Sequence, residues 1–419
     1  MSKLQELIKE LCPEGVEFRK LWNVTIWDKK FNSVDKSKQP KVISYPYLLA
    51  KELFLLEQCN GNVFLLSTGE QTGWTTEELA GDYLCVGEVV TIPWGKSRKV
   101  SEVMKYYKGK FVTADNRIAT SNDTSILSNK YLYYWLLTQS DSIDKCYRGA
   151  GIQHPDMSKI LDFEIPLPPL EIQNEIVRIL DTFTSHAAEL QAELQAELQA
   201  RKEQYEYYRN KLLTFDENDE GVKWMKLGEI GTFVRGNGLQ KKDFTETGFP
   251  CIHYGQIHTY YCTSANSTIS YTSNSLAEKL RKASYGDLII ATTSEDVDCV
   301  CKACAWLGEN DVAISGDAYV FRHNQNPKYV SYLFQTKLFY ELKKKAATGT
   351  KVIRVSGESM EKFLLPFPPF SEQQRIVSIL DKFESLVNDL TAGLPAEIAA
   401  VQEQYEYYRN KLLTFERKS

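Results

Sequence analysis

The sequence lacks the features that mark membrane and secreted proteins. No apolar run approaches the ~18 residues that a membrane-spanning helix needs, and the N-terminal pattern has no uninterrupted apolar stretch typical of a signal peptide. The nine cysteines are an odd number and do not have the spacing of a disulfide framework. We therefore expect a cytoplasmic protein without a membrane partner, in a compartment that keeps thiols reduced.

Motifs of the common enzyme classes are also missing. The sequence contains no Walker A loop, no G-x-G-x-x-G, no nucleophile elbow, no H-E-x-x-H and no zinc-deaminase signature. Cys299, Cys301 and Cys304 form C-x-C-x-x-C, but a second pair of ligands is absent as a motif, so free cysteines in a buried strand are favoured over zinc. These absences predict a binding protein that holds no metal, rather than an enzyme.

The overall charge gives no support for nucleic-acid binding. Lysine and arginine number 50 against 55 acidic residues, a net charge of −5. A basic total would favour nucleic acid. A local basic patch matters more than the sum, however, and the acidic residues gather in the repeated helices and in Asp216–Glu220.

The sequence contains the same segment twice. EQYEYYRNKLLTF occupies Glu203–Phe215 and again Glu403–Phe415, at an offset of two hundred residues. Upstream, the proline-led Pro166–Phe183 returns at the same offset as Pro366–Phe383, and the tetrad AELQ occurs three times over Ala188–Gln199. A repeat at constant offset predicts two equivalent halves.

The stretches before the helices share a framework but differ in nearly every polar residue. Apolar alternation, turn glycines and aromatic helical patterns recur, and Asp115 and Asp317 lie in comparable places. The matched segments are Val16–Val24 with Val222–Ile230, Gly61–Glu70 with Gly286–Glu295, Lys110–Thr120 with Asn310–Phe321, and Lys130–Leu136 with Lys328–Phe334. Each half is thus predicted to be a mixed α/β domain followed by a long helix.

The expected fold is α/β, with two globular domains joined by two long antiparallel helices in a coiled coil, related by a pseudo-two-fold repeat. The expected boundaries are 1–165 for the first domain with a short helix over 2–11, and 166–215 for the first long helix. Residues 216–365 form the second domain with a linker over 216–221, and residues 366–419 form the second helix.

Apolar residues at helical spacing predict that the two helices pack on each other, with four-residue steps across Leu190–Leu198 and Leu386–Ile398. Ser371 followed by Gln374 suggests a capping box. Pro395 stands where the first helix has glutamine, and an interior proline costs ~3 kcal/mol or more. We expect a kink or restart of the second helix there.

The PLPPL-E-x-Q-x-x-I and PFPPF-S-E-Q-Q-x-I helix starts, the tetrad-repeat spacer and the two variable domains resemble the specificity (S) subunit of type I restriction–modification enzymes. The resemblance covers essentially the whole chain. It implies a non-catalytic DNA-recognition subunit whose two domains each read one half of a split, asymmetric target. It also implies that the helices set the gap and dock two methyltransferase subunits, and that two motor–nuclease subunits join for restriction. S-adenosylmethionine, ATP and magnesium are expected only in those partners.

Candidate DNA contacts in both domains are cations beside aromatics, and polar residues of two glycine-rich loops directly before the helices. An ordinary solvated surface, or a packing turn, is the alternative for each. The candidates are Lys96, Arg98, Lys99, Lys105, Lys108, Lys110, Arg148, Gln153 and His154 in the first domain, and Arg235, Asn237, Lys241, Lys242, Lys351 and Arg354 in the second.

Identity at outward positions of the repeated segment suggests partner docking, with recent duplication as the alternative explanation. The candidate docking residues are Gln204, Glu206, Asn210, Lys211, Gln404, Glu406, Asn410 and Lys411. Two other functional classes stay open: a coiled-coil scaffold whose two domains bind proteins rather than DNA, and a methyltransferase or nuclease acting alone.

Overall fold

The computed structural model describes residues 3–96 and 98–418, so Ser2 of the expected N-terminal helix and Ser97 lie outside it. The chain divides into two compact units, Met1–Ala192 with Ala396–Ser419, and Glu193–Pro395. Each unit contains one α/β head, which we define as residues 12–169 in the first unit and 214–369 in the second. Among the described residues, no helix combines the length and apolar character that a bilayer crossing requires.

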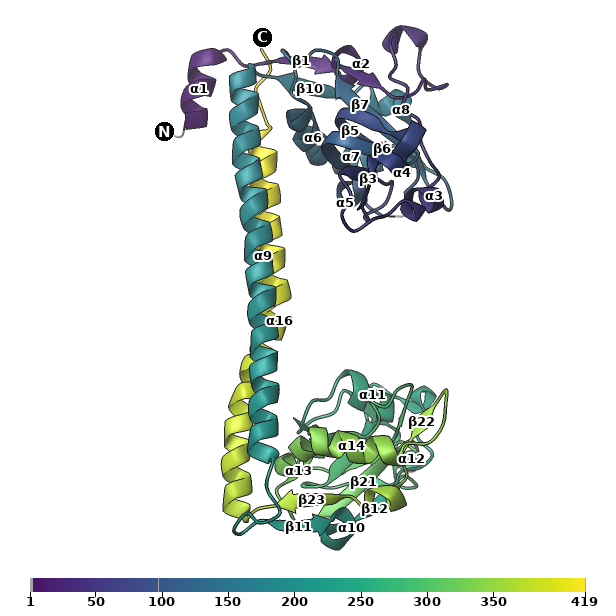
Figure 1. Ribbon diagram of the computed structural model, residues 1–419, viewed down its shortest axis with the longest axis vertical. Helices are drawn as coiled ribbons and strands as arrows, with labels where there is room; N and C mark the ends of the chain where they lie inside the picture. The colour runs from purple at the N-terminus through teal and green to yellow at the C-terminus, as the bar shows by residue number, and fades with distance from the viewer. Residues whose placement is uncertain (1–2, 97, 419) are drawn as a thin grey trace. The chain divides into compact units, whose positions relative to one another are not determined.

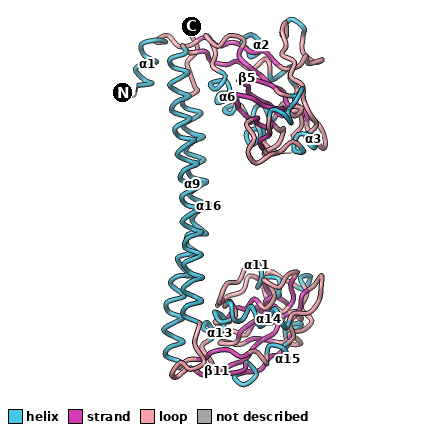
Figure 2. Tube along the Cα trace, viewed as in Figure 1, coloured by secondary structure: helices cyan, strands magenta, loops and turns pink. Residues whose placement is uncertain are grey.

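Two long helices, α9 (Leu170–Leu213) and α16 (Phe370–Leu412), run through both units (Figures 1 and 2). In the first unit the start of α9 lies against the end of α16, where Phe183 stacks on Tyr408 with ring centroids 5.8 Å apart. In the second unit the end of α9 meets the start of α16, and Tyr208 stacks on Phe383 at 5.1 Å. The helices are therefore antiparallel, and the predicted two-helix coiled coil is confirmed.

Several details of the predicted helices are wrong. Leu386, assigned to the seam, is 54% exposed, while its neighbour Val387 is half-buried. The capping box fails because α16 already begins at Phe370, and the backbone N–H groups of Glu372 and Gln373 donate to the carbonyl of Pro369. The helix starts two residues earlier than the capping pattern requires, since the X-Pro-Pro run itself ends the preceding strand.

The expected restart of the second helix does not occur. Pro395 lies inside α16, which continues from Phe370 to Leu412. Proline removes one backbone donor from the interior of a helix. Leu394 and Ile398, on either side of it, stay half-buried on the same face as Leu390, so packing holds the segment helical.

The first head is built on one mixed sheet of six strands in the order β2-β7-β5-β6-β3-β4. Its central pair, β5 and β6, is antiparallel, and β3 joins β6 in parallel. The strands are β2 (Thr25–Trp27), β3 (Val63–Leu66), β4 (Gly73–Thr75), β5 (Cys85–Pro93), β6 (Lys105–Thr113) and β7 (Asn116–Ser121). Short helices surround it: α2 (Leu21–Val24), α3 (Ala50–Leu55), α4 (Glu77–Ala80), α5 (Val100–Val103), α6 (Asn129–Thr138), α7 (Ser140–Asp144) and α8 (Met157–Ile160).

The second head repeats this order as β12-β21-β17-β19-β14 and adds a four-stranded sheet, β15-β13-β20-β16. The edge strand β14 joins its neighbour β19 in parallel, as β3 joins β6 in the first head. The first sheet comprises β12 (Gly231–Arg235), β14 (Ser264–Ala265), β17 (Leu288–Ala291), β19 (Lys302–Trp306) and β21 (Ala318–His323). The second comprises β13 (Phe249–Ile252), β15 (Ser270–Thr272), β16 (Lys282–Ala283) and β20 (Val312–Ile314). The helices are α10 (Leu227–Ile230), α11 (Tyr254–Thr259), α12 (Asn274–Ala277), α13 (Pro327–Leu333), α14 (Lys337–Ala346) and α15 (Gly357–Met360).

The common strand order corrects one predicted match. Gly61–Glu70 contains β3, whereas Gly286–Glu295 contains β17, which lies between β19 and β21 as β5 lies between β6 and β7. The counterpart of β17 is therefore β5. The predicted match was wrong because a turn glycine followed by a buried apolar strand occurs more than once in the same head. Asp115 and Asp317 do correspond, each preceding the equivalent strand β7 or β21.

Each head joins its long helix through a two-stranded sheet of the same kind. In the first unit, β1 (Glu17–Lys20) pairs with β10 (Glu164–Leu167), and in the second β11 (Lys223–Lys226) pairs with β23 (Leu364–Phe367). The strands predicted over Val16–Val24 and Val222–Ile230 are thus half correct, since each turns into a one-turn helix at its midpoint. At the N-terminus, α1 (Lys3–Leu11) buries Leu4 against the first core.

The polar contacts at the two junctions are also the same. On α9, Asp181 accepts from Lys130 Nζ (2.7 Å) and Tyr134 (2.6 Å), both on α6. On α16, Asp381 accepts at 2.8 Å from the equivalent residues of α13, Lys328 and Tyr332. The buried amides Gln173 and Gln373 each bind a preceding proline carbonyl and the loop before the head helix. The heads are attached alike.

Candidate nucleic-acid interface

Several predicted DNA contacts of the first head lie at one edge of its sheet. At this edge β2 and β5 end while β6 and β7 begin, since Pro93 pairs with Asn116 and Thr91 with Lys105. Because these strand ends and strand starts meet at one edge, the loops attached to them lie together. The glycine-rich hairpin of β8 (Tyr147–Arg148) and β9 (His154–Pro155) joins this edge, because Gln153 and Lys96 exchange backbone hydrogen bonds.

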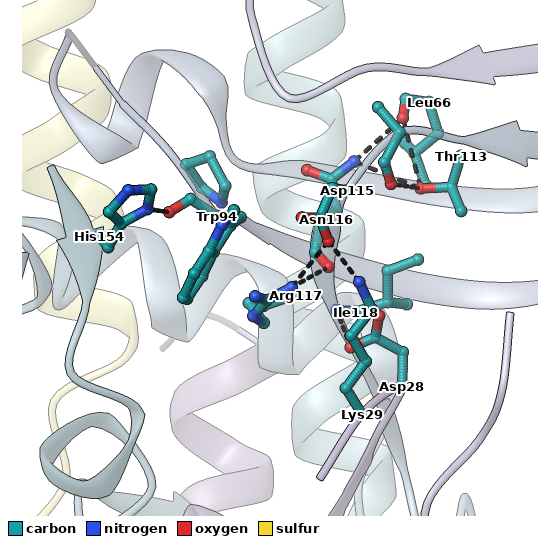
Figure 3. A network of polar contacts seen from close by, with 12 residues as sticks. Asp28, Lys29, Leu66, Trp94, Thr113, Asp115, Asn116, Arg117, Ile118 and His154 are labelled. Atoms are coloured by element: carbon teal, nitrogen blue, oxygen red, sulfur yellow. Dashed lines mark hydrogen bonds and ion pairs between the residues drawn. The ribbon is translucent and has the colours of Figure 1, made fainter. Parts of the chain in front are cut away.

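A buried ionic network stabilises this edge (Figure 3). The side chain of Arg117 is only 7% exposed, and its Nη1 donates to Asp115 Oδ1 (3.0 Å) and to the carbonyl of Asn116 (3.1 Å). Asp115 also accepts from Lys29, which follows β2. The guanidinium thus bonds within the turn between β6 and β7, and the contact of Lys29 with Asp115 ties this turn to the end of β2.

Asp28 belongs to the same edge and has an unusual environment. It is buried, and its Oδ1 accepts from the backbone N–H of Ile118 at 3.0 Å. Burial raises the pKa of Asp28 to about 6, although that hydrogen bond and the nearby charges of Lys29 and Arg117 oppose the shift. A carboxyl group with such a pKa changes its charge within an ordinary experimental pH range.

Trp94 links the network to the hairpin. The guanidinium of Arg117 lies 3.8 Å from the centre of the Trp94 ring, and His154 packs against the indole at 4.5 Å. His154 Nδ1 is also 2.9 Å from the Trp94 carbonyl oxygen. Gly149 has φ of +135°, and an added Cβ would lie 2.8 Å from the carbonyl oxygen of Ile152, so the hairpin needs glycine there. Trp94 thus holds an exposed hairpin against a rigid sheet edge.

The predicted DNA contacts of the first head divide into two groups. Arg98, Lys99, Gly151 and Gln153 line one shallow depression of about 740 Å³ together with Lys96. Their partners are intramolecular in most cases. Lys96 is 7% exposed and pairs with Asp144, Arg98 pairs with Glu70 at 2.6 Å, and Arg148 pairs with Asp156 at 2.9 Å, whereas Lys99 is exposed.

Three predicted contacts on β6 do not belong to this depression. Lys105 begins the strand, and its ammonium donates to the carbonyls of Ser67 (3.0 Å) and Gly69; burial lowers its pKa to about 8. Lys108 and Lys110 lie toward the other end of β6, where they pair with Glu88 (3.4 Å) and Glu77 (2.7 Å). The alternation of cations with aromatics in the sequence did not show which of these lysines would lie at the edge that carries the depression.

The second head has a different set of residues at the corresponding edge. Arg235 ends β12, donates to the carbonyl of Gly316 (3.0 Å) and lies 3.9 Å from Asp317. The second glycine-rich hairpin reaches β18 (Thr293–Ser294) through β22 (Ile353–Arg354), just beyond β17. Lys351 and Arg354 on this hairpin are exposed. The glycine requirement returns, since Gly349 has φ of +102° and an added Cβ would lie 2.1 Å from the carbonyl oxygen of Val352.

The other candidates of the second head have contrasting positions. Asn237 is used structurally, because its side chain donates to the carbonyl of Lys279 (3.0 Å) and accepts from the N–H of Arg281 (2.7 Å). Lys241 and Lys242 are exposed in a 3₁₀ turn, Lys241–Asp243, near the end of β13. The charge of Lys241 contributes to a lowered pKa of His253, after the larger effect of burial.

The predicted docking residues lie mostly on the surface of the long helices. Gln204, Glu206 and Lys211 are exposed on α9, as are their counterparts Gln404, Glu406 and Lys411 on α16; Asn410 is exposed and Asn210 is half-buried. Among them lie Tyr207 and Tyr407, 60% and 59% exposed, each with a lysine ammonium above its ring. The other face of the segment packs inward, with Leu213 and Leu413 buried in the two cores.

The three cysteines of the C-x-C-x-x-C pattern point to different surroundings. Cys301 and Cys304 are buried and Cys299 is exposed, and burial raises the pKa of both buried thiols to about 12. Within residues 3–96 and 98–418, no group of three or more potential ligands is placed to hold a metal ion. Cys301 has φ of +62°, which fits the tight turn before β19.

Sequence patterns missed the charged network and the exposed tyrosines. Asp28 and Lys29 lie far from Arg117 in the chain and the three belong to no motif, so only strand order brings them together. Tyr207 and Tyr407 had a signal, because they are identical in the two segments, but a tyrosine in a helical repeat is equally typical of a coiled-coil core.

Comparison with known proteins gives a consistent family. The model of the type I restriction modification DNA specificity domain matches residues 14–200 and again 219–400. The EcoR124I/EcoR124II specificity subunit of Escherichia coli is 34% identical over 308 residues, covering 71% of this chain and 74% of that protein. A putative type I restriction enzyme specificity subunit of Haemophilus influenzae is 33% identical over 343 residues, covering 80% and 84%.

Solved structures share the fold. The HsdS subunit from Thermoanaerobacter tengcongensis aligns with a TM-score of 0.55 at 15% identity, over 97% of this chain and 99% of its own. A chain from a type I restriction–modification assembly aligns with a TM-score of 0.65 at 14% identity, over 96% and 98%. With two matched domains on two antiparallel helices, and relatives above 30% identity, the chain belongs to the family of type I restriction–modification specificity subunits.

Proposed function

We propose that each head recognises one half of a split, asymmetric duplex DNA target and that the chain itself catalyses no reaction. One observation carries the proposal. The two heads have the same strand order and the same attachment to their helices, yet the loops at corresponding sheet edges carry different side chains. A shared scaffold with two different polar edges is what reading two different half-sites requires.

At the first edge, the exposed Lys99, Gln153 and His154 are the proposed direct contacts. Gln153 can bind adenine through two hydrogen bonds, and cations bind phosphates or guanine. Arg98 and Arg148 would exchange a carboxylate partner for DNA, while the buried Arg117 positions Trp94 and the hairpin. At the second edge, Arg235, Lys241, Lys242, Lys351 and Arg354 take the corresponding part.

The two long helices are proposed to set the gap between the half-sites and to dock the other subunits of the enzyme. The matching faces around Tyr207 and Tyr407 support two equivalent docking sites, since exposed aromatic residues rimmed by polar ones are typical of interfaces. We infer that two methyltransferase subunits dock there and that two motor–nuclease subunits join for restriction. S-adenosylmethionine, ATP and magnesium then belong to those cytoplasmic partners.

Equilibrium binding to duplex DNA tests the proposal. The full chain, alone and with its methyltransferase subunits, is titrated with random duplex and with genomic fragments that contain the methylated site. Binding that weakens steeply with salt and prefers those fragments is the expected result. A protein-binding scaffold would bind no DNA in either state, and methyl transfer by the isolated chain with S-adenosylmethionine would show a catalytic site.

A further inference from the structure

The helix α14 of the second head carries an unusual concentration of lysine. Its sequence, KLFYELKKKA, has one lysine at its start and three in its last turn, Lys343, Lys344 and Lys345, and it leads directly into the glycine-rich hairpin with Lys351 and Arg354 (Figure 1). Cations in a last turn stabilise a helix through its dipole by only ~0.3–1 kcal/mol each. Helix stability alone needs fewer of them.

The burial pattern separates these lysines into two functions. Phe339 and Lys343 face the core, and the Lys343 ammonium donates to the carbonyls of Asp298 (2.7 Å) and Val300 (2.8 Å). This contact ties α14 to the turn before β19. Lys337, Lys344 and Lys345 are exposed and lie within an arc of roughly 100° on the opposite side, at 3.6 residues per turn. The helix therefore presents a fixed basic face.

The lysines of the basic face form no ion pair in the described structure, although one exposed carboxylate, Glu341, lies among them on the helix. In the described part of the second head, the ion pairs to carboxylates involve Arg235, Arg322 and Lys328. None involves Lys337, Lys344, Lys345, Lys351 or Arg354. Glu341 is the one carboxylate on α14, and it forms no ion pair with its helix neighbours in the described structure. An unpaired cluster of cations attracts an anionic surface more strongly than cations already engaged with carboxylates.

The first head offers the opposite arrangement at the same place. Between the head helix α6 and the hairpin lies α7, with the sequence SDSID and no lysine. Its Asp144 neutralises Lys96, and Arg98 and Arg148 are paired with carboxylates as well, which leaves Lys99 and Lys145 as the exposed cations of this depression without an ion pair in the described structure. The two heads thus differ in available positive charge at equivalent positions, although their frameworks agree.

We propose that Lys337, Lys344 and Lys345, continued by Lys351 and Arg354, form a phosphate-binding surface for duplex DNA that is specific to the second head. The inference rests on the proposed DNA-recognition function and adds that the two heads contribute unequally to the affinity for DNA. The second head supplies the larger share of the salt-dependent, sequence-independent affinity, and the first head contributes mainly to discrimination between sequences. Ammonium groups on a rigid helix match a row of phosphates without reading bases.

The salt dependence of DNA binding measures the number of phosphate contacts directly. Each phosphate contact contributes about −0.9 to the slope of log K against log salt concentration. Neutralising three contacts should make the slope less steep by about 2 to 3 and weaken binding about tenfold or more at low salt. Target and random DNA should weaken by the same factor, because phosphates carry no sequence information.

The experiment compares the full chain, together with its methyltransferase subunits, with three triple variants. The test variant is K337S/K344S/K345S. The matched control, K223S/K226S/K362S, removes three exposed lysines that also lack ion pairs but belong to the junction around β11 and β23 of the same head. A third variant, K337R/K344R/K345R, keeps the charge and should retain the wild-type slope, which separates loss of charge from loss of folding.

Each outcome decides between explanations. A smaller slope in the test variant alone, restored by arginine, supports the phosphate surface. An unchanged slope with normal wild-type binding overturns it and leaves the proposed function intact, since the lysines are then merely solvated. Equal losses in test and control variants also overturn it, by showing only a general charge effect. If the wild-type protein does not bind DNA, the proposed function itself fails.

Discussion

At the scale of single residues, the first head depends on charges that are buried in its sheet edge. Arg117 is held by Asp115 and by the face of Trp94, while Asp28 accepts a backbone hydrogen bond from Ile118. Burying an ionised carboxylate is costly unless hydrogen bonds and opposite charges compensate it. For Asp28 the compensation is incomplete, because its pKa is raised to about 6 rather than lowered.

This raised pKa predicts a specific pH dependence of stability. The folded protein binds the Asp28 proton more tightly than the unfolded chain, so the stabilisation is complete below pH ~4 and is lost as pH rises through about 6. A shift of about two pKa units corresponds to ~3 kcal/mol. Asp28→Asn keeps the acceptor for Ile118 but has no charge. Relative to this variant, the wild-type free energy of unfolding should fall by up to ~3 kcal/mol between pH 4 and 7.

Urea unfolding of both proteins across this pH range measures the difference. Asp141→Asn, an exposed carboxylate in α7, serves as the control and should run parallel to the wild type. Parallel curves for wild type and D28N would mean that Asp28 is ionised without cost, and that the network around Arg117 compensates it fully.

At the scale of elements, the repeated helix segment combines two functions that its sequence could not separate. Arg209 and Arg409, Leu213 and Leu413 face the heads, whereas Tyr207 and Tyr407 face outward. Core packing explains identity at the inward positions. Identity at the outward ones needs either a recent duplication or a shared partner, and only a binding experiment distinguishes these.

The shared partner predicts equal effects at the two tyrosines. Exposed tyrosines at an interface centre typically contribute ~2 kcal/mol or more, roughly thirtyfold in Kd. Tyr207→Ala and Tyr407→Ala should each reduce binding from two methyltransferase subunits to one, and the double variant should bind neither. Native mass spectrometry of the purified complexes reads the stoichiometry.

Tyr285→Ala is the matched control, since Tyr285 is a highly exposed tyrosine of the second head, in the segment before β17 and outside the repeated helix segment. It should keep two methyltransferase subunits. If the double tyrosine variant also keeps two, the identical segments reflect duplication and the docking surface lies elsewhere.

The same elements show how far sequence patterns reach. The long helices, the junction strands and the aromatic head helices were predictable, because apolar periodicity and X-Pro-Pro runs act locally. Gly61–Glu70 was matched to the wrong strand since buried strands of one head resemble each other. The exposure of Leu386 and the unbroken course of α16 through Pro395 depend on packing against a second helix. Contacts such as Lys96 with Asp144 depend on the tertiary fold and left no local pattern.

At the scale of the whole molecule, the chain places two differing heads on matched helices. The junctions through Asp181 and Asp381 are equivalent, so the heads differ away from them, in the added sheet of the second head, in their edges and in the basic face of α14. The number of residues in α9 sets the length of this helix. The tetrad AELQ, present three times within α9, is the unit whose deletion changes that length most simply.

Deletion of one tetrad, Ala192–Gln195, tests whether α9 sets the gap of the DNA target. Four residues fewer shorten the helix by ~6 Å and rotate its C-terminal part by about 40° beyond a full turn. We expect the gap between the two half-sites to shorten by one or two base pairs, at ~3.4 Å each, while both half-site sequences stay the same. Methylome sequencing of cells carrying the complete system reads gap and half-sites together.

A length-preserving variant, Gln195→Ala, controls for disturbance of the coiled coil and should leave the gap unchanged. Because the heads are attached through the same contacts in both units, the deletion changes the spacing without altering either reading edge. An unchanged gap would show that α9 does not set the spacing. Altered half-site sequences would instead show that the helices affect how the heads read DNA, and the separation of spacing from recognition would have to be abandoned.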